Sequence, residues 1–156
     1  MRTILTSALI ALAITASAGH GADNSIGTWK LNAKKSTYTP KPMPVKSLTV
    51  TRDALDGGVK VTITGEQANG TPIKATYTAK YDGTDVQVSG NTPYDTISIK
   101  QVNENTLTDA RKKTGGPYEA TSRTVIFNGG KTMTTNTKGM NSQGKEFTST
   151  FVFDKQ

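Results

Sequence analysis

Apolar and polar residues alternate along most of the chain beyond residue 26. From Ile73 to Tyr81 every second residue is apolar or aromatic, and Lys or Thr stands at each position between. The same alternation occurs over residues 59–64 and 97–100. A period of two is typical of half-buried antiparallel strands, because successive side chains of a strand point to opposite faces of the sheet. The chain beyond residue 18 contains no stretch of ten or more residues with the period of a helix.

Short turn sequences separate these runs at intervals of about 8–12 residues, the spacing of all-β sandwiches and barrels. Gly, Asn and Asp dominate the turns, and these residues tolerate the positive φ that tight hairpins require. Because nearly every connection is short, we expect an all-β fold in which an antiparallel up-and-down meander closes into a barrel. A two-sheet sandwich is the alternative. The ten predicted strands cover residues 26–32, 47–53, 58–67, 72–81, 85–89, 95–102, 106–113, 118–127, 131–138 and 145–154.

The first eighteen residues have the pattern of a secretory signal peptide. Arg2 supplies a positive charge, residues 4–14 form an apolar run, and Ala16-Ser17-Ala18 provides a small-residue cleavage site. A membrane anchor is the alternative, but a spanning helix needs about 20 apolar residues. We therefore expect residues 1–18 to be a signal peptide and residues 19–156 to form a single exported β-barrel domain, periplasmic or secreted.

One connection differs from the short turns. Residues 36–44 contain Pro40, Pro42 and Pro44, a spacing that favours an extended, stiff segment. Two interpretations are open. The segment could dock into an aromatic groove of a partner, or it could be a stiff crossing that closes one end of the barrel.

The two ends of the predicted barrel carry the motifs of a known superfamily. Residues 27–31 (GTWKL) open the first strand, and residues 151–156 (FVFDKQ) end the last. With the strand count, these motifs resemble the lipocalin and fatty-acid-binding-protein (calycin) superfamily, whose members begin with Gly-x-Trp and often end in an aromatic, acidic and Lys sequence. The chain also resembles a group of small exported bacterial proteins of unassigned function, which share the GTWKLN start and the Tyr-Asp-Gly to Tyr-Asp-Thr stretch found here over residues 81–96.

The resemblance implies a barrel in which the ring of Trp29 plugs the closed end. It gives less support to a fatty acid as the ligand. The fatty-acid-binding members place a helix pair after the first strand, where this chain has its Pro-rich segment. They also hold the carboxylate with an Arg-x-Tyr pair in the last strand, where this chain has Phe151 and Phe153.

The hairpin of residues 106–113 and 118–127 carries the candidate ligand-binding residues. Placing Lys113 opposite Glu119 matches charges and apolar groups along the whole hairpin. This register turns Arg111 and Arg123 toward the lumen, where a guanidinium must be paired or must bind a polar ligand. The remaining pairs in this register are Arg111 with Thr121, Asp109 with Arg123, and Leu107 with Val125.

We hypothesise that Arg111 and Arg123 bind the anionic head of an amphiphile whose tail lies against Tyr77, Phe151 and Phe153. Two alternatives are open. Arg123 and Asp109 could form an ion pair without any ligand, or this end of the sheet could face solvent.

Composition argues against several kinds of chemistry. The sequence has no Cys and one His, His20, so thiolate metal sites, cysteine nucleophiles and His-based triads are not expected. No acid–base pair is identifiable, and neither EF-hand nor HExxH spacing occurs. We expect no enzymatic activity, no catalytic residue, no metal and no cofactor.

The chain is basic, with 19 Lys and Arg against 12 Asp and Glu. Its Lys residues are scattered over alternate strand positions, which favours solubility or weak attraction to anionic surfaces over nucleic-acid binding. The predicted polar faces carry Lys and Thr, so we expect no lipid-facing band and no membrane span. We expect a monomer.

The leading prediction is a barrel that holds one small hydrophobic or amphiphilic ligand. The rival is an interaction or inhibitor protein of the cell envelope whose barrel is fully packed. The scarcity of large apolar residues that could line a pocket favours the rival.

Overall fold

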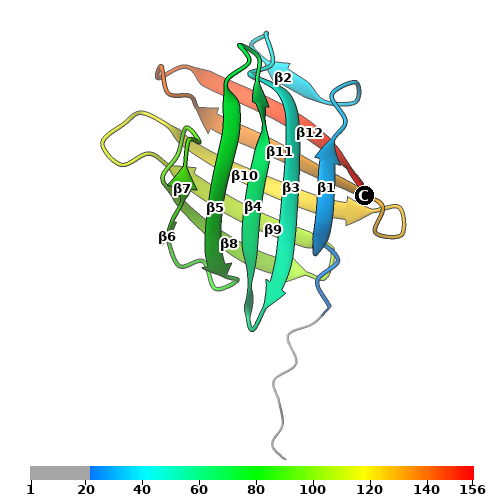
Figure 1. Cartoon of the computed structure of the whole chain (residues 1–156). Coiled ribbons are helices and arrows are strands. Elements are labelled where there is room, and N and C mark those ends of the chain that lie inside the picture. Colours follow the sequence, from blue (N-terminus) through cyan, green and yellow to red (C-terminus); the bar gives the residue numbers. More distant parts are fainter. Residues whose placement is uncertain (1–21) are drawn as a thin grey trace, which may run out of the picture.

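The computed structural model describes residues 22–156, so the predicted signal peptide and His20 lie outside the described part. Residues 22–156 form an all-β structure, a nearly closed antiparallel barrel (Figure 1). The predicted fold class is thereby confirmed. None of the described residues belongs to a helix long and apolar enough to cross a membrane. The strands are β1 (Gly27–Leu31), β2 (Thr37–Thr39), β3 (Val45–Leu55), β4 (Gly58–Gln67), β5 (Pro72–Lys80), β6 (Val86–Gln87), β7 (Ser89–Gly90), β8 (Thr96–Asn103), β9 (Thr106–Lys112), β10 (Glu119–Phe127), β11 (Thr132–Met140) and β12 (Glu146–Lys155).

Alternation decides which side chains enter the barrel. In β5 the pattern is perfect, since each residue from Ile73 to Ala79 that is apolar is buried and each Lys or Thr between is exposed. The buried side chains face the lumen, and those exposed to solvent form the outer wall. The same rule holds over most of β4. In β10 every second residue is also buried, but the buried face carries Ser122 and Thr124 and is not the face that the sequence pattern predicted.

From β3 to β5 and from β8 to β12, strands that follow one another in sequence are paired in space, and β12 also pairs with the early strands β1 and β2. The first strand, β1, pairs with β3 on one side and with the last strand, β12, on the other. This pairing sets Trp29 opposite Lys155 and Leu31 opposite Phe153. The short strand β2, which the sequence did not predict, pairs with an earlier part of β12. In Figure 1 the strands β3 to β5 cross in front of the strands β8 to β12, with the lumen between the two walls.

The segment predicted as one strand over residues 85–89 is divided into two strands of two residues each. The first, β6, pairs with β8, and the second, β7, pairs with β5. Together they fill the space between β5 and β8, where the barrel would otherwise be open. Gly90 lies at this junction with φ of +124°, and a Cβ atom there would be 2.1 Å from the Lys74 carbonyl oxygen. Only glycine permits so close an approach of the two backbones.

Trp29 closes one end of the barrel core. Its ring is fully buried, and its indole N–H donates to the Ser25 carbonyl oxygen at 2.8 Å. It packs in a cluster with Ile126, Met133 and Phe153. The Lys155 ammonium lies 5.0 Å from the ring centroid, in a cation–π contact. The expectation that Trp29 is a core residue is therefore confirmed.

Candidate functional site

The barrel contains an internal cavity of about 870 Å³. It extends from Arg52 and Tyr77 on the wall formed by β3 and β5 to the Pro-rich segment, residues 40–44. The loops over residues 91–94 and 141–145 also border it. Proline residues 40, 42 and 44 therefore lie over one end of the cavity, which agrees with the interpretation of this segment as a crossing at the barrel end.

Four of the five predicted ligand-binding residues line this cavity. They are Tyr77, Arg111, Phe151 and Phe153. Tyr77 and Phe153 are buried, and Phe151 is half-buried with its ring 6.5 Å from that of Phe153 in an edge-on contact. The prediction that these four side chains face the lumen is confirmed, and their binding of a ligand stays a prediction.

The fifth predicted residue, Arg123, does not line the cavity, so the prediction for it is wrong. The hairpin register differs by one residue from the prediction: Lys112, not Lys113, lies opposite Glu119, and Arg123 lies opposite Thr108. A shift of one residue moves every side chain of a strand to the other face. Arg123 is consequently exposed on the outer wall, and the proposed pairing of Arg123 with Asp109 does not occur.

The inner face of β10 instead carries smaller side chains. Ala120 lies opposite Arg111, and Ser122 lies opposite Asp109. Both are buried. These small residues leave room for the guanidinium and the carboxylate within the lumen. The observed register places small residues opposite the two charged side chains of β9, and it still sets a lysine, Lys112, opposite Glu119.

Arg111 is held by several partners at once. Its Nε donates to Asp109 Oδ1 at 2.7 Å, and its Nη2 donates to Asp109 Oδ2 at 3.2 Å and to Ser122 Oγ at 3.0 Å. The guanidinium also lies 5.4 Å from the centroid of the Tyr94 ring. Burial alone would lower the pKa of Arg111, but the Asp109 carboxylate outweighs it, and the pKa lies well above its ordinary value. Arg111 is therefore charged at neutral pH.

A second arginine, which sequence analysis missed, lines the same cavity. Arg52 of β3 is only 7% exposed. Its Nε donates to Ser25 Oγ at 3.0 Å, and its Nη2 has no hydrogen-bond partner. The sequence pattern could have identified Arg52, because it alternates with Leu48 and Val50 along β3 and therefore faces the lumen with them.

Tyr77 faces the same cavity as the two arginines. Arg52 is paired across the sheet with Val61, and Val61 with Tyr77, so the three side chains form one row on the inner face of β3, β4 and β5. Burial raises the pKa of the Tyr77 phenol, and the charges of Arg52 and Arg111 oppose that rise. The phenol therefore stays protonated at neutral pH and can donate a hydrogen bond.

Aromatic rings cover another part of the cavity wall. The ring of Tyr38 stacks on Phe147 with centroids 5.4 Å apart, and Tyr94 stacks on Tyr118 at 5.8 Å. Tyr118 and Phe147 join the two pairs, with centroids 6.2 Å apart. All four residues line the cavity. The cavity thus combines an aromatic wall with two guanidinium groups, the mixture of apolar surface and a few fixed polar groups that small-molecule sites have.

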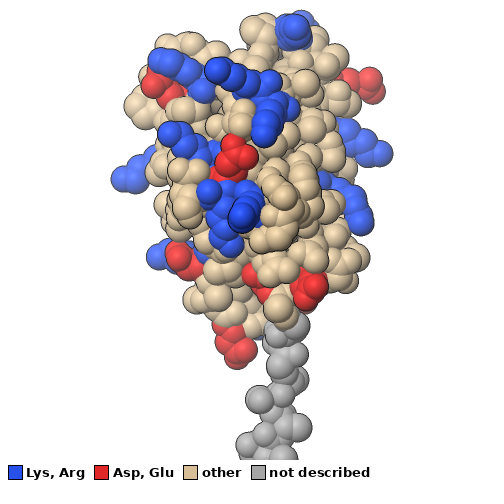
Figure 2. All heavy atoms as spheres, turned by 90° about the vertical axis from the view of Figure 1, so that its right-hand side faces the viewer, with Lys and Arg blue, Asp and Glu red and all other residues tan. Residues whose placement is uncertain are grey.

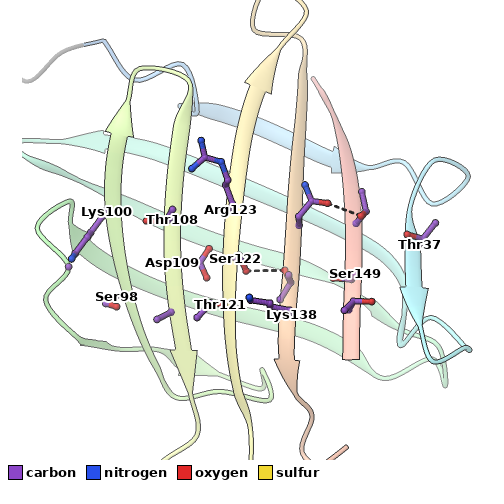
Figure 3. Close-up of a pocket in the computed structure, with 16 residues that line it drawn as sticks. Thr37, Ser98, Lys100, Thr108, Asp109, Thr121, Ser122, Arg123, Lys138 and Ser149 are labelled. Atoms are coloured by element: carbon purple, nitrogen blue, oxygen red, sulfur yellow. Dashed lines mark hydrogen bonds between the residues drawn. The ribbon is translucent and has the colours of Figure 1, made fainter. Parts of the chain in front are cut away.

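A second hollow lies on the outer wall over β8 to β12 (Figure 3). Its exposed lining is hydroxyl and amide side chains together with Lys100, Arg123 and Lys138. Across the neighbouring face in Figure 2, Lys and Arg are spread over the surface and interspersed with Asp and Glu. Within residues 22–156 no group of three or more His, Cys, Asp or Glu side chains is placed to hold a metal ion.

Comparison with known proteins identifies no relative by sequence. No protein-family model matches the chain, and no curated protein matches it significantly. Among solved structures, the chain is similar to one described as EF1p2_mFAP2b bound to DFHBI, with a TM-score of 0.47 and 11% sequence identity. The similarity covers 85% of this chain and 94% of that one.

Proposed function

We propose that this chain is an exported, non-enzymatic binding protein that holds one small hydrophobic or amphiphilic molecule inside its barrel. The observation that carries the proposal is the internal cavity of about 870 Å³, lined by aromatic and aliphatic side chains with a few buried polar groups. Drug-sized ligands occupy cavities of roughly 300–1,000 Å³ with this kind of lining.

The rival function, an envelope interaction or inhibitor protein with a packed barrel, requires an interior filled by side chains. The cavity argues against that requirement. The inner walls carry small residues such as Thr135, Thr137 and Ser149, which do not fill the space between them. The large rings lie along the wall and leave the middle of the lumen free.

Native mass spectrometry of protein purified from its host tests the proposal directly. We expect a fraction of the molecules to carry a small organic molecule that is lost on denaturation. A matched pair of variants locates it. Ser149→Phe adds a ring inside the lumen, whereas Thr148→Phe adds the same ring on the outer wall.

We expect the adduct to be absent from Ser149→Phe and retained by Thr148→Phe, with both variants folded by circular dichroism. Protein that carries no small molecule, and that binds no apolar probe when probes are added, would contradict the proposal. Capture of a protein partner by such empty protein would favour the rival.

A further inference from the structure

The two arginines of the cavity differ in how their charges are balanced. Arg111 is neutralised by the Asp109 carboxylate through two hydrogen bonds. Arg52 forms no ion pair with any carboxylate among residues 22–156, and its one hydrogen bond is to the neutral Ser25 hydroxyl. Arg52 is nevertheless the more buried of the two. A buried cation without a counter-ion is costly, because burial removes the water that would solvate it.

Asp23 is the acidic residue nearest in the hydrogen-bond network, and its oxygens are already used. It accepts hydrogen bonds from the Ser25 backbone N–H at 2.9 Å, from Ser25 Oγ at 2.6 Å and from the Tyr81 hydroxyl. The Ser25 hydroxyl therefore stands between Asp23 and Arg52. Asp23 orients Ser25 toward Arg52 but does not reach the guanidinium.

We propose that Arg52 binds the negatively charged group of the ligand, which is a small organic anion with an aromatic body. The proposal rests on the proposed function and specifies its ligand class. The anionic group lies beside Arg52 at the end of the cavity away from the Pro-rich segment. A ligand carboxylate or sulfonate there supplies the counter-ion that the chain does not.

Tyr77 completes the anion site. It stands in the same cross-strand row as Arg52, and its protonated phenol provides a second donor for an anionic oxygen. Arg111 also lines the cavity, but its charge is already balanced by its bonds to Asp109, so it competes less for the anion. Two donors from different strands, one of them charged, fix both the position and the orientation of an anionic group.

The aromatic wall determines the rest of the ligand. The rings of Tyr94 and Tyr118 and those of Tyr38 and Phe147 are stacked in pairs along the cavity. A planar aromatic body packs against such a wall by offset stacking, which adds to the gain from burial of its apolar area. The charged group and the stacked body together discriminate against neutral molecules and against anions without an apolar part.

Two fluorescent probes with the same rings separate the contribution of the charged group from that of the aromatic body. The probe 1-anilinonaphthalene-8-sulfonate is anionic, and N-phenyl-1-naphthylamine lacks the sulfonate and is neutral. Binding of each is measured by fluorescence titration to the full folded chain. We expect the wild-type protein to bind both probes, and Ser149→Phe to exclude both.

The decisive variant is Arg52→Met, which keeps the length of the side chain and removes its charge. We expect it to weaken binding of the sulfonate probe by about 10- to 100-fold, the effect of losing a charged hydrogen-bond donor. Binding of the neutral probe should change by less than about twofold. Arg52→Lys should retain part of the discrimination. Arg123→Met, on the outer wall, is the matched control and should leave both affinities unchanged.

Equal weakening of both probes by Arg52→Met would show that Arg52 only supports the barrel, and the assignment would be overturned while the proposed function stands. If the wild-type protein bound neither probe, or if Ser149→Phe excluded neither, the proposed function itself would fail. Should Arg52→Met not fold, ¹⁵N NMR of the wild-type arginine side chains decides the question. The sulfonate probe should then shift the Arg52 Nε–H signal and the neutral probe should not; equal responses would overturn the assignment.

Discussion

Arg111 and Asp109 stand two residues apart on the same strand, and their side chains form a doubly hydrogen-bonded ion pair inside the barrel. The arrangement is possible because residues i and i+2 of a strand point to the same face. Arg111 also donates a hydrogen bond to Ser122 and lies over the Tyr94 ring. The ion pair is therefore linked to β10 and to the loop before β8. It accounts for the presence of both charges in the lumen without a ligand.

Removing the acidic member of this pair should destabilise the protein. In Asp109→Ala the guanidinium of Arg111 loses its counter-ion, and we expect the free energy of unfolding to fall by about 2 kcal/mol. The side chains are 20% and 11% exposed, so the cost is below that of a fully buried pair. Urea denaturation measures it.

The control is Asp85→Ala, which breaks the exposed ion pair with Lys112. Asp85→Ala should lower the free energy of unfolding by at most about 1 kcal/mol, as is usual for ion pairs on the surface. Equal costs for the two variants would show that the internal pair contributes no more than a surface one.

Tyr81 should make the protein sensitive to alkali. Burial, together with the hydrogen bond to Asp23, raises the pKa of its phenol to about 12, against the opposing charge of Arg52. A pKa higher in the folded than in the unfolded chain stabilises the fold below pH 10, and this stability is lost as pH rises from about 10 to 12. We expect the free energy of unfolding to fall over that window.

Denaturation at a series of pH values checks this prediction. Tyr81→Phe should make the profile less steep, and the slope that remains is due to the other buried tyrosines, whose pKa values are also raised. The absorbance of ionised tyrosine provides an independent measurement, in which one fewer group should titrate near pH 12 in the variant. An unchanged profile in Tyr81→Phe would assign the alkaline transition to other tyrosines.

Trp29 should report on the integrity of the barrel core in which it is buried. It is the single Trp of the chain and is fully buried, so its fluorescence emission should be blue-shifted and protected from acrylamide. Trp29→Phe removes the indole N–H that bonds to Ser25, and we expect a loss of about 2–3 kcal/mol in urea denaturation. Phe127→Leu, at an exposed position, should stay within about 0.5 kcal/mol of the wild type.

Gly90 should be among the positions least tolerant of a methyl group. Gly90→Ala adds strain from the positive φ and brings the new Cβ against the backbone of β5, with an expected cost above about 2 kcal/mol. Gly129 also has a positive φ but has nothing within 4 Å of the added Cβ. Gly129→Ala should therefore cost only about 1 kcal/mol, the conformational part alone. Thermal unfolding measures the stability loss of each variant. The difference between the two losses is the cost of the close backbone contact at the β5–β7 junction.

Most of the fold could be predicted from the sequence because period-two alternation is strong in the strands that form the core. The prediction was weakest where both faces of a strand carry apolar residues. In β10, Val125 and Phe127 occupy one face and Ala120 and Ile126 the other, so hydrophobicity alone does not choose the inner face. The choice depends on room for the side chains of β9, which is a property of the assembled barrel.

The candidate site was predictable only in part for the same reason. Tyr77 and Phe153 follow from parity within their own strands. Alternation along β3 also predicts that Arg52 points inward with Leu48 and Val50. It does not predict that the Nη2 atom of Arg52 has no hydrogen-bond partner, because that depends on which residues of other strands surround it. The division of residues 86–90 between two partner strands likewise depends on the width of the space between β5 and β8.

The pairing of β1 with β12 joins residues more than a hundred positions apart in the chain. During synthesis, β1 therefore has no partner strand on one side until β12 (Glu146–Lys155) has left the ribosome. Contacts of such large sequence separation form slowly, because the intervening loop must close first. The barrel consequently has no finished hydrophobic interior until β12 has been synthesised, which leaves a period in which the unfinished chain is available to a chaperone.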